Sequence, residues 1–454
     1  MSTTREVLRR RPPARPFVQR GVAAVALGAA AALGGLVAVD PRLALAVVAA
    51  GLFVALLWYD LRLAIAAWIA VVFLEDIPLL NAAGKATGAA VALACVLAWP
   101  RLRDTNPLRG QSDVLVPLGL LGVWLGLSLG WAVDVGTTAA AIGQWYAVNV
   151  AFLVVATAMA DRMGLRLAAA AFVGGALLSV LVGALLGGGD EGRFAGTLGD
   201  PNLLAAGLVP AAVLAVGLAS GGGGPARRAL GGAALVVLGG GLVASGSRGG
   251  LVGLVAALLV GVVVTRRRRA ELLAVVAVLA AGAAAVLLWL QPAAWSERSA
   301  SAGPGSGRAD LWEVAWHMAG DHAVTGVGLG AYPDVAVDYV RRLGPLQAVD
   351  LIAAEPHEAH NLYLQLLAET GIVGFVLFVA FAAACLRSAW RAARCFDRAG
   401  EVANAALARA VLVAGIGMLG AEAFISAGVD RRLWALLALG PASLAAARGP
   451  RPTS

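Results

Sequence analysis

The sequence predicts an all-α membrane protein: a polytopic bundle of about 12 to 14 transmembrane helices with one large extracytoplasmic loop that contains short helices. Of its 454 residues, 60% are hydrophobic and only 14% are charged, and the mean hydropathy is +0.82. A chain with so little polar surface cannot cover a soluble globule of this size. Apolar runs of about 17 to 25 residues, each long enough to cross the hydrocarbon core as a helix, recur along almost the whole chain.

These apolar runs divide the chain into segments. We predict spans at 21–39, 43–59, 63–79, 86–100, 114–133, 137–160, 165–187, 203–219, 229–246, 249–264, 271–290, 360–386, 403–427 and 433–447. The resulting organisation is a basic cytoplasmic N-terminus (1–20), N-terminal helices (21–187), central helices (188–290), a large outer loop (291–359), C-terminal helices (360–447) and a cytoplasmic tail (448–454). The first helix also fits a secretory signal peptide, but a second span follows at once, which favours an uncleaved helix.

The basic residues predict how the bundle is oriented. If both termini face the cytoplasm, the inner segments hold most of the 35 Lys and Arg residues, as the positive-inside rule requires. The net charge of +8 therefore reflects membrane orientation, and nothing in the sequence resembles a nucleic-acid-binding module. Cys95, Cys385 and Cys395 predict no disulfide in an outer loop, and the four histidines form no zinc-binding spacing. We expect neither a metal nor a cofactor.

The outer loop is long for a connection in a compact protein, and such loops are often functional. Within it, RADLWEVAWHMA at 308–319 has helical periodicity. One face would carry Trp312, Ala315, Trp316 and Ala319, and another Asp310, Glu313 and His317. We expect this helix to lie along the outer leaflet with its tryptophans at headgroup depth. A helix that only anchors the loop is the alternative interpretation.

Four cationic or protonatable residues from distant parts of the chain fall on the predicted outer rim. Arg193 lies in GDEGRFAGTLGDPNLLA, Arg248 in the glycine-rich turn ASGSRGGLVG, and Arg308 at the start of the loop helix, while His360 opens the span at 360–386. Guanidinium groups bind phosphate oxygens bidentately, and amides of glycine turns and helix N-termini add further donors. We therefore expect these residues to hold a lipid-linked pyrophosphate at the outer membrane surface.

Each arginine also has a simpler interpretation. Arg193 could pair with an acidic residue of its own loop, Arg248 could extend to the lipid headgroups from a helix end, and Arg308 could pair with Asp310. Arg341 and Arg342 are expected to be solvated residues of the loop.

The stretch EPHEAHNLYLQLLAETGIVG, residues 355–374, places carboxylate and imidazole side chains at the start of one predicted span. His360 can accept or guide a proton near neutral pH, and Glu358 is the alternative base. Asn361 and Tyr363 follow on the first helical turn and could orient His360 or a sugar. Glu369, about nine residues into the predicted span, must be protonated or paired with a partner that the sequence does not identify.

Four motifs in this order resemble the O-antigen ligase and O-antigen polymerase (Wzy-like) superfamily. They are GRFAGTLGDPNLLA, SGSRGGLVGL, GRADLWEVAWHMAGDHAVTGVGLGAYPD and EAHNLYLQLLAETGIVGF, which together extend over about residues 190–385. The resemblance implies a metal-independent glycosyltransferase that uses an undecaprenyl-diphosphate-linked glycan as donor on the outer face of the bacterial cytoplasmic (inner) membrane. The acceptor would be lipid A core or a growing polysaccharide, and the sequence leaves ligase and polymerase open.

The resemblance also implies roles for individual residues. By motif position, the counterparts of the arginines that hold the diphosphate are Arg193, Arg248 or Arg308, and the counterpart of the histidine tied to catalysis is His360. From the residues themselves we expect all three arginines to bind the diphosphate, with Glu358 as the alternative base. We add Asn202, His317, Asn361 and Tyr363 as possible substrate-binding residues. In-line attack by an acceptor hydroxyl on the anomeric carbon would invert that centre, with the arginines stabilising charge on the departing diphosphate.

A polytopic transporter or a lipid-linked oligosaccharide flippase is the alternative function. Transporters usually place charged side chains at mid-bilayer on broken helices and show similarity between their halves. Here we expect the span interiors to be nearly free of charge and the polar groups to gather at the outer rim, which favours the enzyme.

Overall fold

The computed structural model describes residues 41–77, 88, 107–190, 192–220, 224–265, 308–343 and 358–449. The chain forms two units, 1–55 and 56–454, and most of α2 (Pro41–Tyr59) belongs to the first. The second unit contains α3 (Leu61–Val71), α5 (Ser112–Leu127), η1 (Ser128–Gly130), α6 (Val135–Ala158), α7 (Arg162–Leu186), α8 (Pro201–Ala219), α9 (Pro225–Ser245), α10 (Arg248–Val264), α13 (Arg308–Asp321), α14 (Tyr332–Leu343), α16 (Leu362–Arg398), α17 (Val402–Ala421), η3 (Glu422–Phe424) and α18 (Arg431–Arg448).

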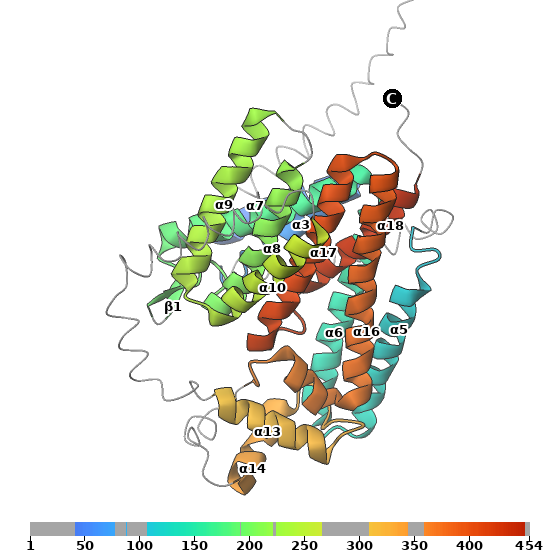
Figure 1. Ribbon diagram of the computed structural model, residues 1–454. Helices are drawn as coiled ribbons and strands as arrows, with labels where there is room; N and C mark the ends of the chain where they lie inside the picture. Colours follow the sequence, from blue (N-terminus) through green and yellow to red (C-terminus); the bar gives the residue numbers. More distant parts are fainter. Residues whose placement is uncertain are drawn as a thin grey trace, which may run out of the picture. The chain divides into compact units, whose positions relative to one another are not determined.

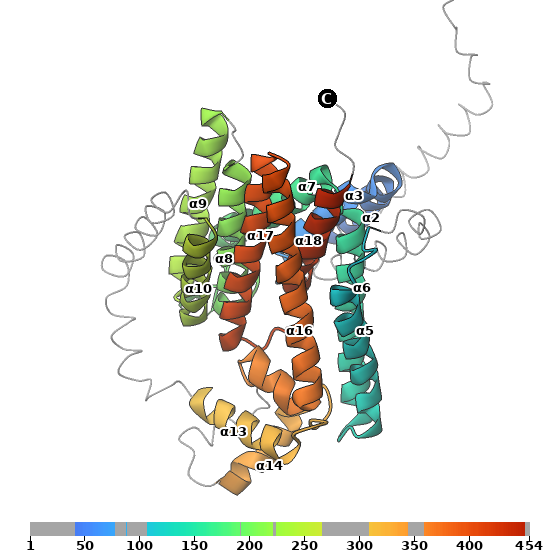
Figure 2. The same cartoon turned by 45° about the vertical axis from the view of Figure 1, so that its right-hand side comes forward.

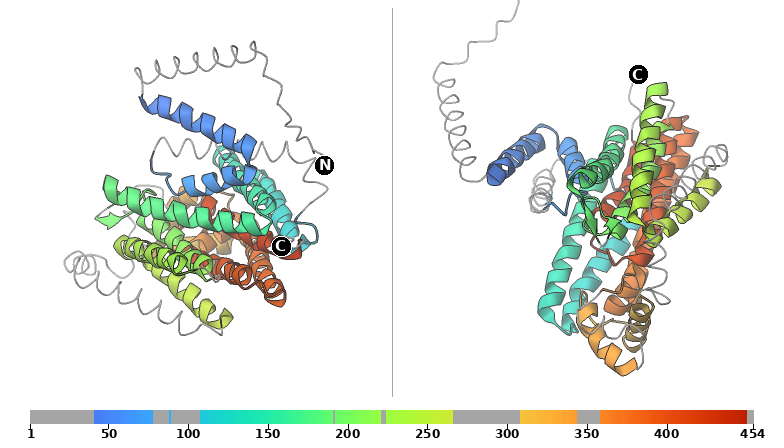
Figure 3. Two further views of the ribbon diagram at one scale, coloured as in Figure 1. Left: turned by 90° about the horizontal axis from the view of Figure 1, so that it is seen from above. Right: turned by 90° about the vertical axis from the view of Figure 1, so that its left-hand side faces the viewer.

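The second unit is a helix bundle, which confirms the predicted all-α class. Helices α8, α9, α10 and α17 pack together, as do α5, α6, α16 and α18, and α16 and α17 join the two groups (Figure 1). The view from above shows the red and orange helices α16 to α18 beside the yellow-green helices α8 to α10 (Figure 3). The described strands, β1 (Gly189–Asp190) and β2 (Arg193–Phe194), form a single short antiparallel hairpin.

Seven of the described helices are long and apolar enough to cross a membrane: α5 with η1, α6, α7, α8, α9, α16, and α17 with η3. Their bounds agree with seven of the predicted spans to within a few residues, apart from the C-terminal extension of α16. Helix α10 is apolar but shorter, and α3 ends at Val71, well before the predicted limit of 79. The predicted spans 21–39, 86–100 and 271–290 lie outside the described residues. The chain is a multi-pass membrane protein.

Aromatic packing holds α6, α16 and α18 together in the middle of the bundle. Trp434, which is fully buried, stacks on Phe381 at a centroid distance of 5.3 Å and meets Trp145 edge-on at 5.8 Å. Phe152 contacts Phe381 at 4.9 Å. Such pairs stabilise a core beyond the area that they bury, and this core gives the end of the bundle that carries α13 a rigid base.

Helices α13 and α14 lie at one end of α16 and form a layer of their own (Figure 2). Their core is apolar and includes Leu311, Val314, Met318 and the fully buried Tyr332, whose hydroxyl donates to the Leu311 carbonyl at 2.7 Å. The face of α13 that packs on the protein consists of residues 311, 314, 315, 318 and 319. Of the predicted apolar face, Ala315 and Ala319 are buried there, whereas Trp316 is 65% exposed.

The predicted span at 360–386 corresponds to α16, whose helical backbone is interrupted at Gly371. This glycine has φ 66° and ψ −174°, a conformation that essentially only glycine adopts. The first segment, 362–370, is bonded to the α13–α14 layer: Val327 N donates to Ala368 O, and Gly328 N donates to Glu369 O, both at 3.0 Å. Glu369 thus belongs to this layer, where it accepts from the Gln365 amide at 3.1 Å and from the Tyr332 N–H at 3.4 Å.

Candidate functional site

Arg193 is held at the point where β2 meets the ends of α8 and α9. Its Nε donates to the Ser245 carbonyl at 2.8 Å, and its Nη2 donates to Asn202 Oδ1 at 3.1 Å. The side chain is half-buried. Among the partners that the sequence suggested for Arg193, Asp200 instead caps α8 through the Asn202 and Leu203 N–H groups. The guanidinium plane is therefore oriented by neutral oxygen atoms on two different elements.

Arg248 is brought to the same place by the turn between α9 and α10. Gly246 ends α9 in the left-handed region at φ 57°, and Ser247 caps α10 by accepting from the Gly250 N–H at 3.1 Å. The Ser247 hydroxyl also donates to Asn202 Oδ1 at 2.9 Å, the same oxygen that binds Arg193. Arg248, the first residue of α10, is exposed. Two helix N-termini, those of α8 and α10, meet beside two arginines, and each favours an anion.

Arg308, the first residue of α13, lies within electrostatic range of Arg248 and of Asp200, the cap of α8. Burial lowers the pKa of its guanidinium, the Asp200 carboxylate raises it, and the positive charge of Arg248 lowers it. A coupling of this kind requires the charges to be near one another. Arg308 is therefore near Arg248, and Arg193 is linked to Ser247, the neighbour of Arg248, through Asn202.

His360 adopts a conformation that is uncommon for its residue type. Its φ is 48°, and it is the only non-glycine residue with positive φ in the part of the chain that the structure describes. Asn361 then caps α16 by accepting from the Tyr363 and Leu364 N–H groups at 3.0 and 3.1 Å. Strained backbone of this kind persists only when the surroundings hold it in place. The half-buried His360 is therefore fixed immediately before a capped helix.

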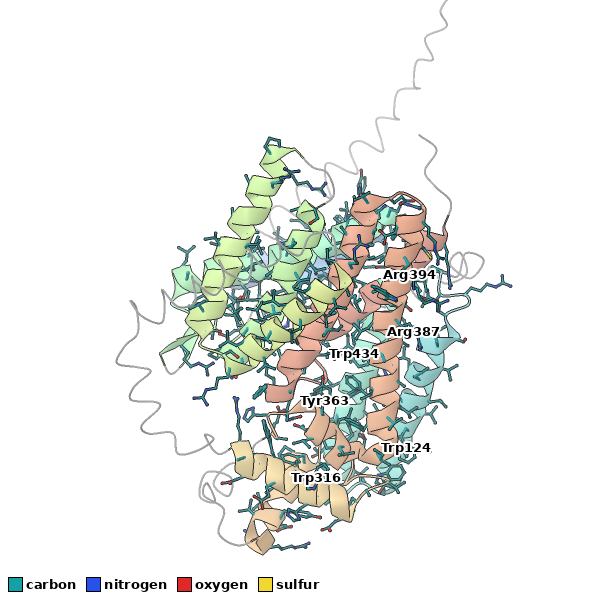
Figure 4. All side chains as sticks on the ribbon, viewed as in Figure 1. Trp124, Trp316, Tyr363, Arg387, Arg394 and Trp434 are labelled. Carbon is teal, nitrogen blue, oxygen red and sulfur yellow. The ribbon has the colours of Figure 1, made fainter. Side chains whose placement is uncertain are left out.

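The segment that holds His360 in place is residues 419–430, which we call the connector. Its Ser426 hydroxyl accepts from the Asn361 N–H at 3.2 Å, and its Leu419 carbonyl accepts from the Tyr363 hydroxyl at 2.6 Å. Tyr363 lies between α13 and α17 (Figure 4). Both contacts are made by residues that directly follow His360, so the connector helps to fix the start of α16, where the backbone places His360.

The connector also touches the elements that carry the arginines. Phe424 meets Trp312 of α13 at a ring-centroid distance of 5.9 Å, and a Cβ added to Gly249, the neighbour of Arg248, would lie 2.7 Å from the Phe424 Cβ. Leu203, the neighbour of Asn202, packs against a cluster that contains Ala421 and Ile425. Residues that neighbour the arginines and residues that neighbour His360 therefore contact the same short segment, the connector.

Sequence reasoning missed the connector and the charges beneath it. Glu422, Asp430 and Arg432 are at most 9% exposed. Glu422 lies inside the predicted span 403–427, although we expected the span interiors to be nearly free of charge. The available signal for the other two was VDRRLWALLALG, in which two arginines and an aspartate directly precede an apolar helix.

The remaining predicted residues lie in less enclosed places. Glu358 is exposed, yet desolvation by the surrounding protein raises the pKa of its carboxyl. His317 is exposed on α13, away from the helix start that carries Arg308. Arg341 is 73% exposed and pairs with Asp338 at 3.5 Å. Within the described ranges, no group of three or more His, Cys, Asp or Glu side chains is placed to hold a metal ion.

Residues 233–379 match the protein family described as O-antigen ligase. The matched range contains three of the four motifs that carried the predicted resemblance, with Arg248, Arg308 and His360, whereas Arg193 precedes it. No curated protein matches the chain. The match confirms the predicted resemblance.

Proposed function

We propose that the chain, whose residues 233–379 match the O-antigen ligase family, transfers a glycan from an undecaprenyl-diphosphate donor to an acceptor hydroxyl. The observation that supports this proposal is that Asn202 binds both Arg193 and Ser247, the neighbour of Arg248, while Arg308 lies within electrostatic range of Arg248 and of Asp200, the cap of α8. An arrangement of this kind suits a diphosphate, because it offers guanidinium forks and two helix dipoles to the same anion.

The proposed reaction divides the work between the arginines and one base. The acceptor oxygen forms a bond to the anomeric carbon while the bond from that carbon to the diphosphate oxygen breaks. Negative charge grows on the leaving diphosphate, and Arg193, Arg248 and Arg308 stabilise it. The acceptor proton passes to His360 or to Glu358, and lipid diphosphate is the second product. Attack from the side opposite the leaving group would invert the anomeric configuration.

We propose that the site faces outward from the bacterial cytoplasmic membrane. Arg387 and Arg394 lie toward one end of α16, and Tyr363 lies at its other end, near α13 with Trp316 (Figure 4). Since basic residues concentrate on the cytoplasmic side, the α13 end is assigned to the outer face. The exposed Trp316 on α13 fits headgroup depth on that face. Both termini are then cytoplasmic, and the acceptor is lipid A core or a growing polysaccharide.

The test is glycan transfer by the purified protein in detergent, with an undecaprenyl-diphosphate-linked oligosaccharide and an acceptor glycan. Wild-type protein should form the glycosidic product, and Arg193→Ala, Arg248→Ala and Arg308→Ala should each lose about 10²-fold or more in kcat/KM. Arg341→Ala is the matched control, because it removes an exposed arginine from the same outer layer. No transfer by wild-type protein, or equal effects in the control and the site variants, would refute the proposal.

A further inference from the structure

A buried group of charged side chains lies at the base of the connector. Glu422 is fully buried, and Arg432 and Asp430 are 1% and 9% exposed. Arg432 Nε donates to Asp430 Oδ1 at 2.8 Å, and the same oxygen accepts from the Arg432 backbone N–H at 2.8 Å. Beside them, Arg431 pairs with Glu75 at 3.1 Å. Three carboxylates and two guanidinium groups therefore share one region below the proposed site.

Several polar atoms of this group are left without hydrogen bonds. Both carboxylate oxygens of Glu422, Asp430 Oδ2 and Arg432 Nη1 make none of good geometry within the described residues, although the Ala427 N–H is near Glu422. Burying polar groups in this state is costly, and apolar side chains of similar size are often at least as stable there. A contribution to stability therefore does not explain these side chains.

The charged group lies at both ends of residues 422–430, which we call the connector turn. Glu422 begins η3 at one end, within electrostatic range of Arg432, and Asp430 caps α18 at the other through the Arg432 N–H. Trp434 Nε1 donates to the Gly428 carbonyl at 2.8 Å, which ties the middle of the turn to α18. Between these points lies Ser426, whose hydroxyl accepts from the Asn361 N–H.

We propose that Glu422 and Arg432 are positioning residues for glycan transfer: by fixing the connector turn, they hold Ser426 and the Leu419 carbonyl where they deliver His360 to the anomeric centre. This inference rests on the proposed function. Neither residue touches the substrate, and both act through Asn361 and Tyr363. Since an error of about 1 Å at a reacting group can cost about 10² in rate, a small shift of this turn is enough to reduce kcat.

The experiment compares Glu422→Gln, Arg432→Met and Arg432→Lys with wild type in the transfer assay, over a range of donor concentrations. We expect kcat to fall about 10- to 100-fold in Glu422→Gln and Arg432→Met, with KM for the donor within twofold, because the arginines that bind diphosphate are unchanged. Arg432→Lys should recover part of the lost kcat. The matched control is Asp397→Asn, which breaks the 2.7 Å ion pair with Arg409 at the opposite end of α17 and should leave kcat unchanged.

Other results would overturn the inference. Unchanged kcat in Glu422→Gln and Arg432→Met would show that the group does not position the site. A rise in KM at constant kcat would assign it to donor binding. Thermal melting shows whether the conservative variants Glu422→Gln and Arg432→Lys are folded. If both are unfolded, the charged group has a purely structural role. Failure of wild-type protein to transfer glycan would instead refute the proposed function, so the two failures are distinguishable.

Discussion

Replacing Arg193 with lysine tests whether the shape of the guanidinium matters in addition to its charge. The two Arg193 hydrogen bonds, to the Ser245 carbonyl at 2.8 Å and to Asn202 Oδ1 at 3.1 Å, leave from different nitrogens. A single ammonium on a flexible stem cannot make both bonds while also facing a diphosphate. Loss of one charged hydrogen bond costs about 1.5 to 3 kcal/mol. At about 1.4 kcal/mol per factor of ten, Arg193→Lys should reduce kcat/KM roughly 10- to 150-fold.

The assay is steady-state transfer with the purified variant, accompanied by a melting curve to show that it is folded. Arg193→Ala should have a lower kcat/KM than Arg193→Lys, because the alanine variant also lacks the positive charge. The control is Arg341→Lys, an exposed arginine on α14 whose replacement should leave kcat/KM within twofold. Wild-type kcat/KM in Arg193→Lys would refute the reasoning, since a point charge would then be sufficient.

Three further predictions concern the outer layer. Gly371→Ala should lower the melting temperature and abolish transfer, because alanine at φ 66° is strained and its Cβ would clash with the Val324 carbonyl. A wild-type melting temperature in this variant would contradict the prediction. Asn361→Ala should destabilise the protein by about 1 kcal/mol through the lost helix cap, and Asn361→Asp should have the wild-type melting temperature. Equal melting temperatures of the two variants would count against the cap. If Glu358 is the base, kcat/KM should fall as the pH decreases through its raised pKa, and Glu358→Gln should remove this limb of the profile. A limb that persists in Glu358→Gln would assign the base to His360.

The raised pKa of Glu358 also determines the sign of its effect on stability. A carboxyl with a higher pKa in the folded state binds its proton more tightly there than in the unfolded chain. Its stabilising contribution to the free energy of unfolding is therefore present at low pH and is lost as the pH rises through the raised pKa. Glu358→Gln should make unfolding less dependent on pH in this range.

The helices were largely predictable from the sequence because an apolar run that crosses a bilayer must be helical. The limits of α6, α7 and α8 agree with the predicted spans to within about three residues, since Asp134, Asp161 and Asp200 each cap the start of a helix. The break in α16 was not predictable in the same way. Glycine is common inside membrane helices, and only the contact of Gly371 with residues 324 and 325 shows that it ends one helix.

The candidate site was predictable in part. The three arginines were unusual because the topology predicted from the sequence puts them on the side of the membrane that disfavours basic residues. What brings them together was not visible: one oxygen of Asn202 accepts from both Arg193 and Ser247. The connector was missed because its contacts, such as that of Phe424 with Trp312, join residues far apart in the chain and have no periodic signature.

The central claim is that Arg193, Arg248 and Arg308 grip one diphosphate at the end of the bundle that carries α13. A cryo-electron microscopy structure of the purified protein with undecaprenyl diphosphate tests it most directly. We predict phosphate oxygens within hydrogen-bonding distance of all three guanidinium groups, with His360 facing the position of the anomeric carbon. A diphosphate bound beside the arginines at the opposite end of α16, or contacted by none of these three, would contradict the account.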